Sequence, residues 1–92
     1  MTVFSGDVPQ TTLNITVATL IKAAPGMLVS FSVNVAGAAG TINDAATVGA
    51  AAAANAICAT PAAVEAVFFP AKFQNGLVVV PGAGQTVTVT WT

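Results

Sequence analysis

The chain has 92 residues, of which 55% are hydrophobic and 5% are charged, and its formal net charge at pH 7 is −1. A typical soluble domain carries about 25% charged residues, so this protein must expose mainly uncharged side chains. The sequence has no histidine, one cysteine and three carboxylates, whereas acid–base catalysis and metal binding need clusters of such groups. We therefore predict a protein that is not an enzyme and that uses no metal or cofactor.

The same composition limits the partners. Two basic residues are too few to neutralise several phosphates at once, which argues against binding to nucleic acid. The longest apolar stretch, residues 45–59, consists mainly of Ala and is too short to span a bilayer, so we expect no membrane segment. The first ten residues do not resemble a secretory signal, which predicts synthesis in the cytoplasm. So little charge gives little repulsion between copies, and we expect partners to cover part of the surface.

The N-terminal segment differs from the rest of the chain. Residues 1–11 contain Gly6 and Pro9 and show no sustained alternation, which predicts an extended arm. Residues 12–92 are then expected to form a single β-domain. The arm has apolar anchors that are candidate contacts to a partner: Val3, Phe4 and Val8.

Alternation of apolar and polar residues is the strongest local signal. Residues 13–17, 29–35 and 87–91 show it clearly, which predicts antiparallel strands with one buried face. Pro25 and Gly26 fit the centre of a type II turn, so we predict a hairpin between the first two of these strands.

A second predicted hairpin ends the chain. Residues 77–80 are apolar at every position, which predicts a strand covered on both faces, and Pro81-Gly82 is expected to turn it onto the last strand. Asn75-Gly76 is a strong tight-turn signal, so residues 77–80 should also pair with the strand that precedes this turn.

The middle of the chain is less regular. Residues 41–43 predict a short strand, and Asp44 is expected to cap the loop that follows. Residues 45–56 are mostly Ala and allow two interpretations, one or two helical turns or a close-packed loop. We prefer the loop, because a helix made of Ala would bury too little apolar area to dock firmly.

Two further strands are predicted after this loop, at residues 57–60 and 64–69, and Pro70 is expected to end the second. Cys58 has no second cysteine to pair with and is expected to be a small buried hydrophobe.

These elements predict an all-β fold, a small antiparallel β-sandwich or barrel of six to seven short strands with an extended N-terminal arm. Trp91 should be substantially buried on the last strand. The expected core consists of the apolar members of the alternating segments: Leu13, Ile15, Val17, Val29, Phe31, Val33, Val35, Ile42, Ile57, Val67, Phe69, Leu77, Val79, Val87, Val89 and Trp91.

Three phenylalanines are further candidate partner contacts: Phe68, Phe69 and Phe73. Adjacent residues of one strand point to opposite faces, so Phe68 and Phe69 cannot both point inward. One of them is therefore expected to be an exposed anchor for a partner. The alternative is a bulge at Pro70 that buries both.

Three segments carry a family resemblance: the Pro25-Gly26 turn, residues 40–44 with the pattern Gly-Thr-x-x-Asp, and residues 75–82 with the sequence NGLVVVPG. In these segments the chain resembles a family of small proteins encoded by tailed bacteriophages, and the similarity covers roughly residues 12–92. Size and β character are similar to those of capsid decoration (cement) proteins, which sit on the outside of the head, commonly as trimers.

The resemblance implies a virion structural protein made in the host cytoplasm and placed on the capsid exterior. Its expected partners are the major capsid protein lattice, which it would stabilise, and further copies of itself, in a homo-oligomer that we expect to be a trimer like those of the decoration proteins. The alternative is a tail, fibre or baseplate β-module with a receptor- or carbohydrate-binding role. The resemblance transfers no functional residues, because fold-level likeness does not define a site.

Overall fold

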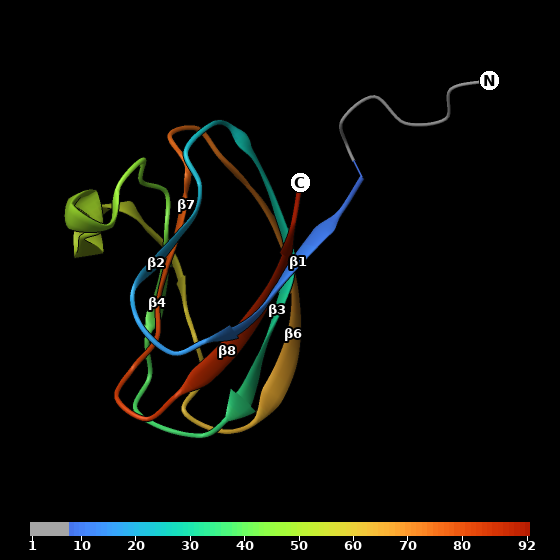
Figure 1. Cartoon of the computed structure of the whole chain (residues 1–92), viewed down its shortest axis with the longest axis vertical. Coiled ribbons are helices and arrows are strands. Elements are labelled where there is room, and N and C mark those ends of the chain that lie inside the picture. The colour runs from blue at the N-terminus through green and yellow to red at the C-terminus, as the bar shows by residue number, and fades with distance from the viewer. Residues whose placement is uncertain (1–7) are drawn as a thin grey trace.

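In the computed structural model, residues 8–92 are described and form two four-stranded antiparallel sheets (Figure 1). The strands are β1 (Gln10–Ile15), β2 (Thr19–Lys22), β3 (Gly26–Val35), β4 (Thr41–Asn43), β5 (Ala56–Ala59), β6 (Glu65–Phe73), β7 (Leu77–Val80) and β8 (Thr86–Trp91). The all-β prediction is confirmed, with eight strands in the described residues in place of six or seven. Most of the predicted arm lies outside the described residues, and its last two residues belong to β1.

The two sheets alternate along the chain. Sheet A has the order β1-β8-β3-β6 and sheet B has the order β2-β7-β4-β5. Among consecutive strands only β4 and β5 pair, and every other connection leads from one sheet to the other. Figure 1 shows the sheets as two layers joined by loops at both ends.

Both predicted hairpins are therefore wrong. Pro25-Gly26 leads from β2 in sheet B to β3 in sheet A, and Pro81-Gly82 leads from β7 in sheet B towards β8 in sheet A. The turn at Asn75-Gly76 also joins different sheets, so β6 and β7 do not pair. Pro-Gly and Asn-Gly turns reverse the chain whether the next strand joins the same sheet or the opposite one. Strands with alternating apolar residues bury one face in both arrangements, so the sequence pattern does not distinguish them.

Apolar side chains from both sheets meet in one core between the layers. Eight residues of the predicted core are buried: Ile15, Phe31, Val33, Ile42, Leu77, Val79, Val87 and Val89. Val29, Ile57, Val67 and Trp91 are partly buried. Leu28 and Phe73 are buried as well, although the sequence did not place them in the core.

Four predicted core residues are exposed: Leu13, Val17, Val35 and Phe69. The prediction that Leu13 is buried is wrong because the pairing of β1 with β8 shifts between Thr12 and Ile15. Asn14, which lies in this irregularity, has a φ of 56°. An extra residue moves a strand's side chains to the other face, so Ile15 points inward and Leu13 does not. Val17 lies after the end of β1, and Val35 is the last residue of β3.

The strand β7 is covered on both faces by its own chain. Leu77, Val78 and Val79 are fully buried, as their continuous apolar sequence predicted.

The alanine-rich segment combines features of both interpretations. It contains two single-turn 3-10 helices, η1 (Val48–Ala50) and η2 (Ala53–Asn55), joined by extended residues. None of the residues in these two turns is buried, which agrees with the small apolar area available from Ala.

Pro70 does not end its strand. β6 runs through it to Phe73, and the pairing of β6 with β3 shifts between Leu28 and Ser30, opposite this proline. Since β6 is the edge of sheet A, the missing N–H of Pro70 need not interrupt a central ladder.

Candidate binding surface

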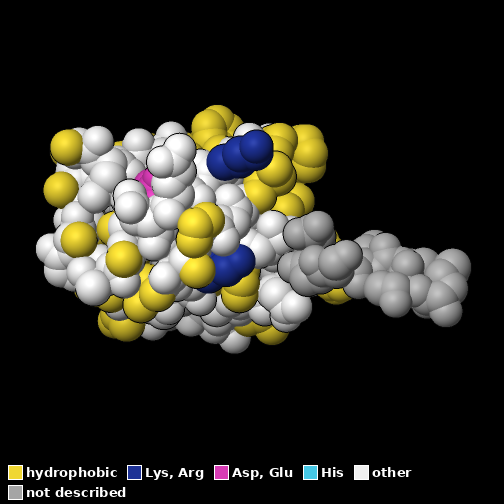
Figure 2. Space-filling view, turned by 90° about the horizontal axis from the view of Figure 1, so that it is seen from above, with side chains coloured by type: hydrophobic (Ala, Val, Ile, Leu, Met, Phe, Trp, Pro, Cys, Tyr) yellow, Lys and Arg dark blue, Asp and Glu magenta, His cyan; other side chains and the backbone are white. Residues whose placement is uncertain are grey.

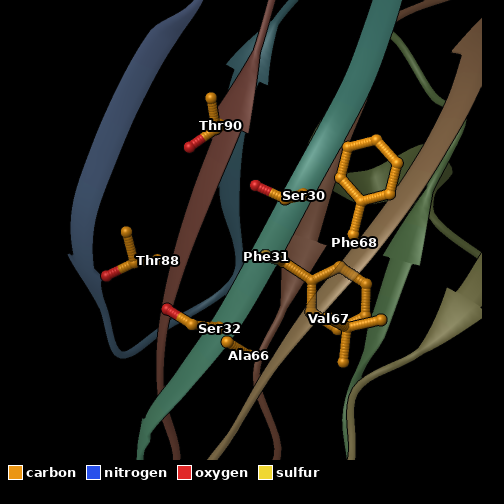
Figure 3. A pocket seen from close by; sticks show the side chains of 8 residues that line it. All are labelled: Ser30, Phe31, Ser32, Ala66, Val67, Phe68, Thr88 and Thr90. Carbon is orange, nitrogen blue, oxygen red and sulfur yellow. The ribbon is translucent and has the colours of Figure 1, made fainter.

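The outer face of sheet A carries aligned hydroxyl groups. On β3, Ser30 and Ser32 alternate with buried Phe31, and on β8, Thr88 and Thr90 alternate with buried valines. Ser30 pairs with Thr90, and Ser32 pairs with Thr88. Figure 3 shows these four side chains in adjacent rows along the two strands. The alternation of both strands thus presents a polar and uncharged surface to solvent.

An exposed aromatic ring borders these rows. Phe68 on β6 pairs with Ser30 and is 77% exposed, and Ala66 pairs with Ser32. Together with the hydroxyls these side chains line a shallow groove of about 480 Å³ that has no charged residue in its lining (Figure 3). Complete burial of a phenylalanine stabilises by roughly 1.5–3 kcal/mol, so Phe68 is a strong anchor for any surface that covers it.

The candidate contact residues differ in their exposure to solvent. Phe68 and Phe69 are exposed, and the alternative in which a bulge at Pro70 buries both is wrong. Val8 is also exposed and lies just before β1. Val3 and Phe4 lie outside the described residues.

Phe73 is a core residue and not a surface contact. It is 1% exposed and pairs with Gly26, and a Cβ atom at Gly26 would lie 2.8 Å from the tip of the Phe73 ring. The glycine therefore makes room for the ring. Sequence reasoning missed this role because β6 was expected to end at Pro70.

The hydroxyl rows were also missed as a surface. Each strand showed its polar face in the sequence, but Ser30 and Thr90 are far apart in the chain. Only the pairing of β3 with β8, which no local turn specifies, brings them together.

One end of the sandwich is closed by Asp44, which caps the β6–β7 turn and not, as the sequence had predicted, the loop that follows Asp44. Its carboxylate accepts hydrogen bonds from the backbone N–H groups of Gln74 at 3.0 Å, Asn75 at 2.7 Å and Gly76 at 3.3 Å. Burial by itself raises the pKa of Asp44, but these hydrogen bonds outweigh it and hold the pKa below the ordinary value. The charged form is therefore the one that holds the β6–β7 turn.

The opposite end is closed by two buried polar residues. Thr60 donates to Oε1 of Gln85 at 2.7 Å and accepts from the N–H of Gly40 at 2.8 Å. The amide of Gln85 also donates to the carbonyl of Pro61 at 2.7 Å, and its Oε1 accepts from the N–H of Gly82 at 3.2 Å. This network connects three loops and leaves no buried side-chain polar atom unsatisfied among the described residues.

Trp91 is only partly buried. Its ring packs against the core, its indole N–H donates to Oγ1 of Thr12 at 3.1 Å, and Nζ of Lys22 lies 5.9 Å from the ring centroid. Trp91 was expected to be substantially buried, and it lies instead at the border of the core, with its indole N–H bonded to Thr12.

Cys58 on β5 also packs at the edge of the core and is half-buried. Burial raises the pKa of its thiol, so the neutral form is favoured near pH 7.

Charged side chains are sparse in the described part of the chain. Figure 2 shows one end of the molecule, where the few lysine and acidic atoms lie apart among uncharged ones and apolar side chains are spread over the surface. Within residues 8–92, no three His, Cys, Asp or Glu side chains come together, and no helix is long and apolar enough to cross a membrane. Comparisons with protein-family models, with curated proteins and with solved structures found no match.

Proposed function

We propose that this protein is a virion structural protein of a tailed bacteriophage that decorates the capsid exterior, where it binds the major capsid protein lattice as a homo-oligomer. The observation that carries the proposal is the outer face of sheet A, where exposed Phe68 borders an uncharged groove lined by Ser and Thr hydroxyls. The family resemblance of residues 12–92 supports the same function.

The groove has the composition of a protein-binding surface. An exposed aromatic residue can supply a large share of the binding energy once a partner covers it, and the hydroxyls that line the groove can supply hydrogen bonds without the desolvation cost of charges. In the proposed mechanism the decorating protein binds only the assembled lattice and therefore stabilises the shell by mass action.

Both ends of the sandwich support the proposed mechanism. Asp44 holds the β6–β7 turn, and Gln85 connects the loops at the other end, so the strands that carry the groove are fixed on both sides. A surface fixed in this way loses little conformational entropy when a partner covers it.

The experiment compares binding of variants to phage capsids that lack the protein. Thr88→Lys places a charge in the middle of the outer face, and we expect it to weaken binding at least about tenfold without unfolding the protein. Leu13→Lys is the matched control, since Leu13 is an exposed apolar residue of β1 at the other edge of sheet A. Equal binding of Thr88→Lys and wild type, or absence of the protein from purified virions, would reject the proposal.

A second candidate function is a carbohydrate-binding module of the tail, fibre or baseplate. This function is favoured by the position of Phe68 beside Ser30 and Thr90. The aromatic ring can stack on a sugar ring while the Ser and Thr hydroxyls hydrogen-bond to the hydroxyl groups of the sugar. Binding of the isolated protein to host surface polysaccharide, lost in Phe68→Ser, would favour this candidate over capsid decoration.

A further inference from the structure

The β6–β7 turn contains a dipeptide that can modify itself. An asparagine side chain loses ammonia when the backbone nitrogen of the next residue attacks its Cγ atom, and a side chain on that next residue hinders the attack. Asn75 is followed by Gly76, which has no side chain. The other four asparagines precede residues that do have side chains: Ile15, Val35, Asp44 and Ala56. Asn75 is therefore the asparagine whose neighbour most favours this reaction.

The reaction is deamidation, and its only co-reactant is water. The backbone nitrogen of Gly76 forms a bond to Cγ of Asn75, and its proton passes through solvent to the departing amide, which leaves as ammonia. The product is a cyclic imide. Water then opens one of the two C–N bonds of the imide, which gives either aspartate or isoaspartate at this position. In isoaspartate the main chain runs through the former side-chain carbon.

The side chain that reacts is exposed, but the nitrogen that attacks it belongs to a buried residue. Asn75 is exposed and Gly76 is buried. A Cβ atom at Gly76 would collide with the carbonyl oxygens of Lys22, at the end of β2, and Ala45, after β4. The Gly76 backbone therefore has little room for the rotation that an attack on Cγ requires.

Hydrogen bonds hold the same backbone in place. Oδ1 of Asp44 accepts from the N–H of Asn75 at 2.7 Å and from the N–H of Gly76 at 3.3 Å. The carbonyl of Gly76 accepts from the N–H of Ala45 at 3.2 Å. The attacking nitrogen must lose its proton, and the carboxylate of Asp44 opposes this step because it places a second negative charge next to the first.

We propose that Asn75 is a site of spontaneous deamidation and that Asp44 suppresses the reaction while the β6–β7 turn is closed. The reaction then proceeds from the fraction of molecules in which this turn is open. Local opening of a turn is an equilibrium of its own and does not require the whole protein to unfold. The rate of deamidation at Asn75 therefore reports how firmly Asp44 closes this end of the sandwich.

The product weakens the closure that delayed its formation. Deamidation places a new carboxylate beside Asp44, and the two negative charges repel each other. Isoaspartate also adds an atom to the main chain, next to the point where Gly76 is packed against the backbone of Lys22 and Ala45. Modified molecules should therefore be less stable than unmodified ones, and the change accumulates with time.

Mass spectrometry after cleavage at lysine measures the reaction. Cleavage after Lys22 and Lys72 places Asn75 in the peptide 73–92, which contains no other asparagine. The mass of this peptide increases when the amide becomes an acid, and fragment spectra exclude a change at its two glutamines. The isolated full-length protein is used throughout, so the inference does not rest on the proposed function.

Two variants at opposite ends of the sandwich give the comparison, each incubated at neutral pH under conditions where circular dichroism shows it to be folded. Asp44→Ala should deamidate at Asn75 about 5–30 times faster than the wild type, because the turn is open more often. Gln85→Leu loses the buried network at the other end and should keep the wild-type rate. Asp44→Asn keeps the size of the side chain and removes its charge, and it should also exceed the wild-type rate.

The wild type unfolded in urea gives the rate without protection. Absence of deamidation at Asn75 under these conditions would reject the site itself. Equal rates in the folded wild type and in both Asp44 variants would reject the protection by Asp44. Equal acceleration in Gln85→Leu would do the same, because it would show that only unfolding of the whole protein exposes the site.

The modified protein tests the effect on the turn. Anion exchange separates it from the unmodified protein, since deamidation adds a negative charge, and Asn75→Gln should yield no such acidic form over the same period. We expect the melting temperature of the modified protein to be lower by at least about 4 °C. An unchanged melting temperature would contradict the proposed weakening of this end.

Discussion

The two ends of the sandwich are closed by similar backbone contacts but by different polar groups (Figure 1). At one end Gly76 lies against the backbone of residues 22 and 45, and Asp44 caps the turn. At the other end Gly82 lies against the backbone of residues 38 and 39, beside the buried pair Thr60 and Gln85. The first end should therefore respond to pH, and the second should respond only to the loss of neutral hydrogen bonds.

The largest effect is expected from Gly82→Ala. A Cβ atom at this position would lie 1.9 Å from the carbonyl oxygen of Ala38, so the two loops must separate. We expect a loss of about 3 kcal/mol in the free energy of unfolding, measured by urea denaturation at pH 7.

Gly49→Ala is the matched control for this change, because no atom lies within 4 Å of the added Cβ atom. It should change stability by less than about 1 kcal/mol. If both variants unfold at the same urea midpoint as the wild type, the close approach of Gly82 to the backbone of Ala38 does not stabilise this end of the sandwich.

The next effect concerns the buried network. Gln85→Leu keeps the volume of the side chain but leaves the Thr60 hydroxyl, the Gly82 N–H and the Pro61 carbonyl without their partner. We expect a loss of about 2–3 kcal/mol from these unsatisfied groups. Gln74→Leu, at an exposed glutamine in the β6–β7 turn, should change stability far less. Similar melting curves for the two variants would show that the buried network contributes little.

The polar contacts at the two ends are alike in that neither could be predicted. Asp44 was expected to cap the loop that follows it, but its carboxylate caps the β6–β7 turn, 30 to 32 residues further along the chain, so this contact depends on the fold and not on a local signal. Thr60 and Gln85 look like ordinary polar loop residues in the sequence, and they meet only because the chain passes between sheets at residues 36–40, 60–64 and 81–85.

The fold was predictable in its class and in the positions of its turns, but not in its pairing. Pro25-Gly26 and Pro81-Gly82 do reverse the chain, yet a turn does not specify whether the next strand joins the same sheet or the opposite one. The candidate binding surface, too, could be predicted only where it does not depend on strand pairing. Phe68 could be identified from its neighbour Phe69, whereas the hydroxyl rows depend on the pairing of β3 with β8.

A smaller effect is expected when Asp44 is truncated. Asp44→Ala removes the acceptor of three backbone N–H groups that remain close to solvent, so water replaces part of what is lost. We expect a loss of about 1–2 kcal/mol at pH 7, or roughly 4–16 °C in melting temperature measured by circular dichroism. A melting temperature within 2 °C of wild type, on the order of experimental error for a domain of this size, would show that the turn closes without the carboxylate.

The smallest effect is the pH dependence, and it separates the two ends directly. The folded-state pKa of Asp44 lies below its unfolded value, so its contribution to stability is complete above the unfolded pKa, near pH 4, and is lost as pH falls through the folded pKa. The stability difference between wild type and Asp44→Asn should therefore shrink as pH is lowered from about 6 to about 2. The difference between wild type and Gln85→Leu should stay constant over the same range, because neither Gln85 nor Thr60 titrates. Urea denaturation of the three proteins at each pH measures both differences, and a constant Asp44→Asn difference would mean that the charge of Asp44 does not close its end.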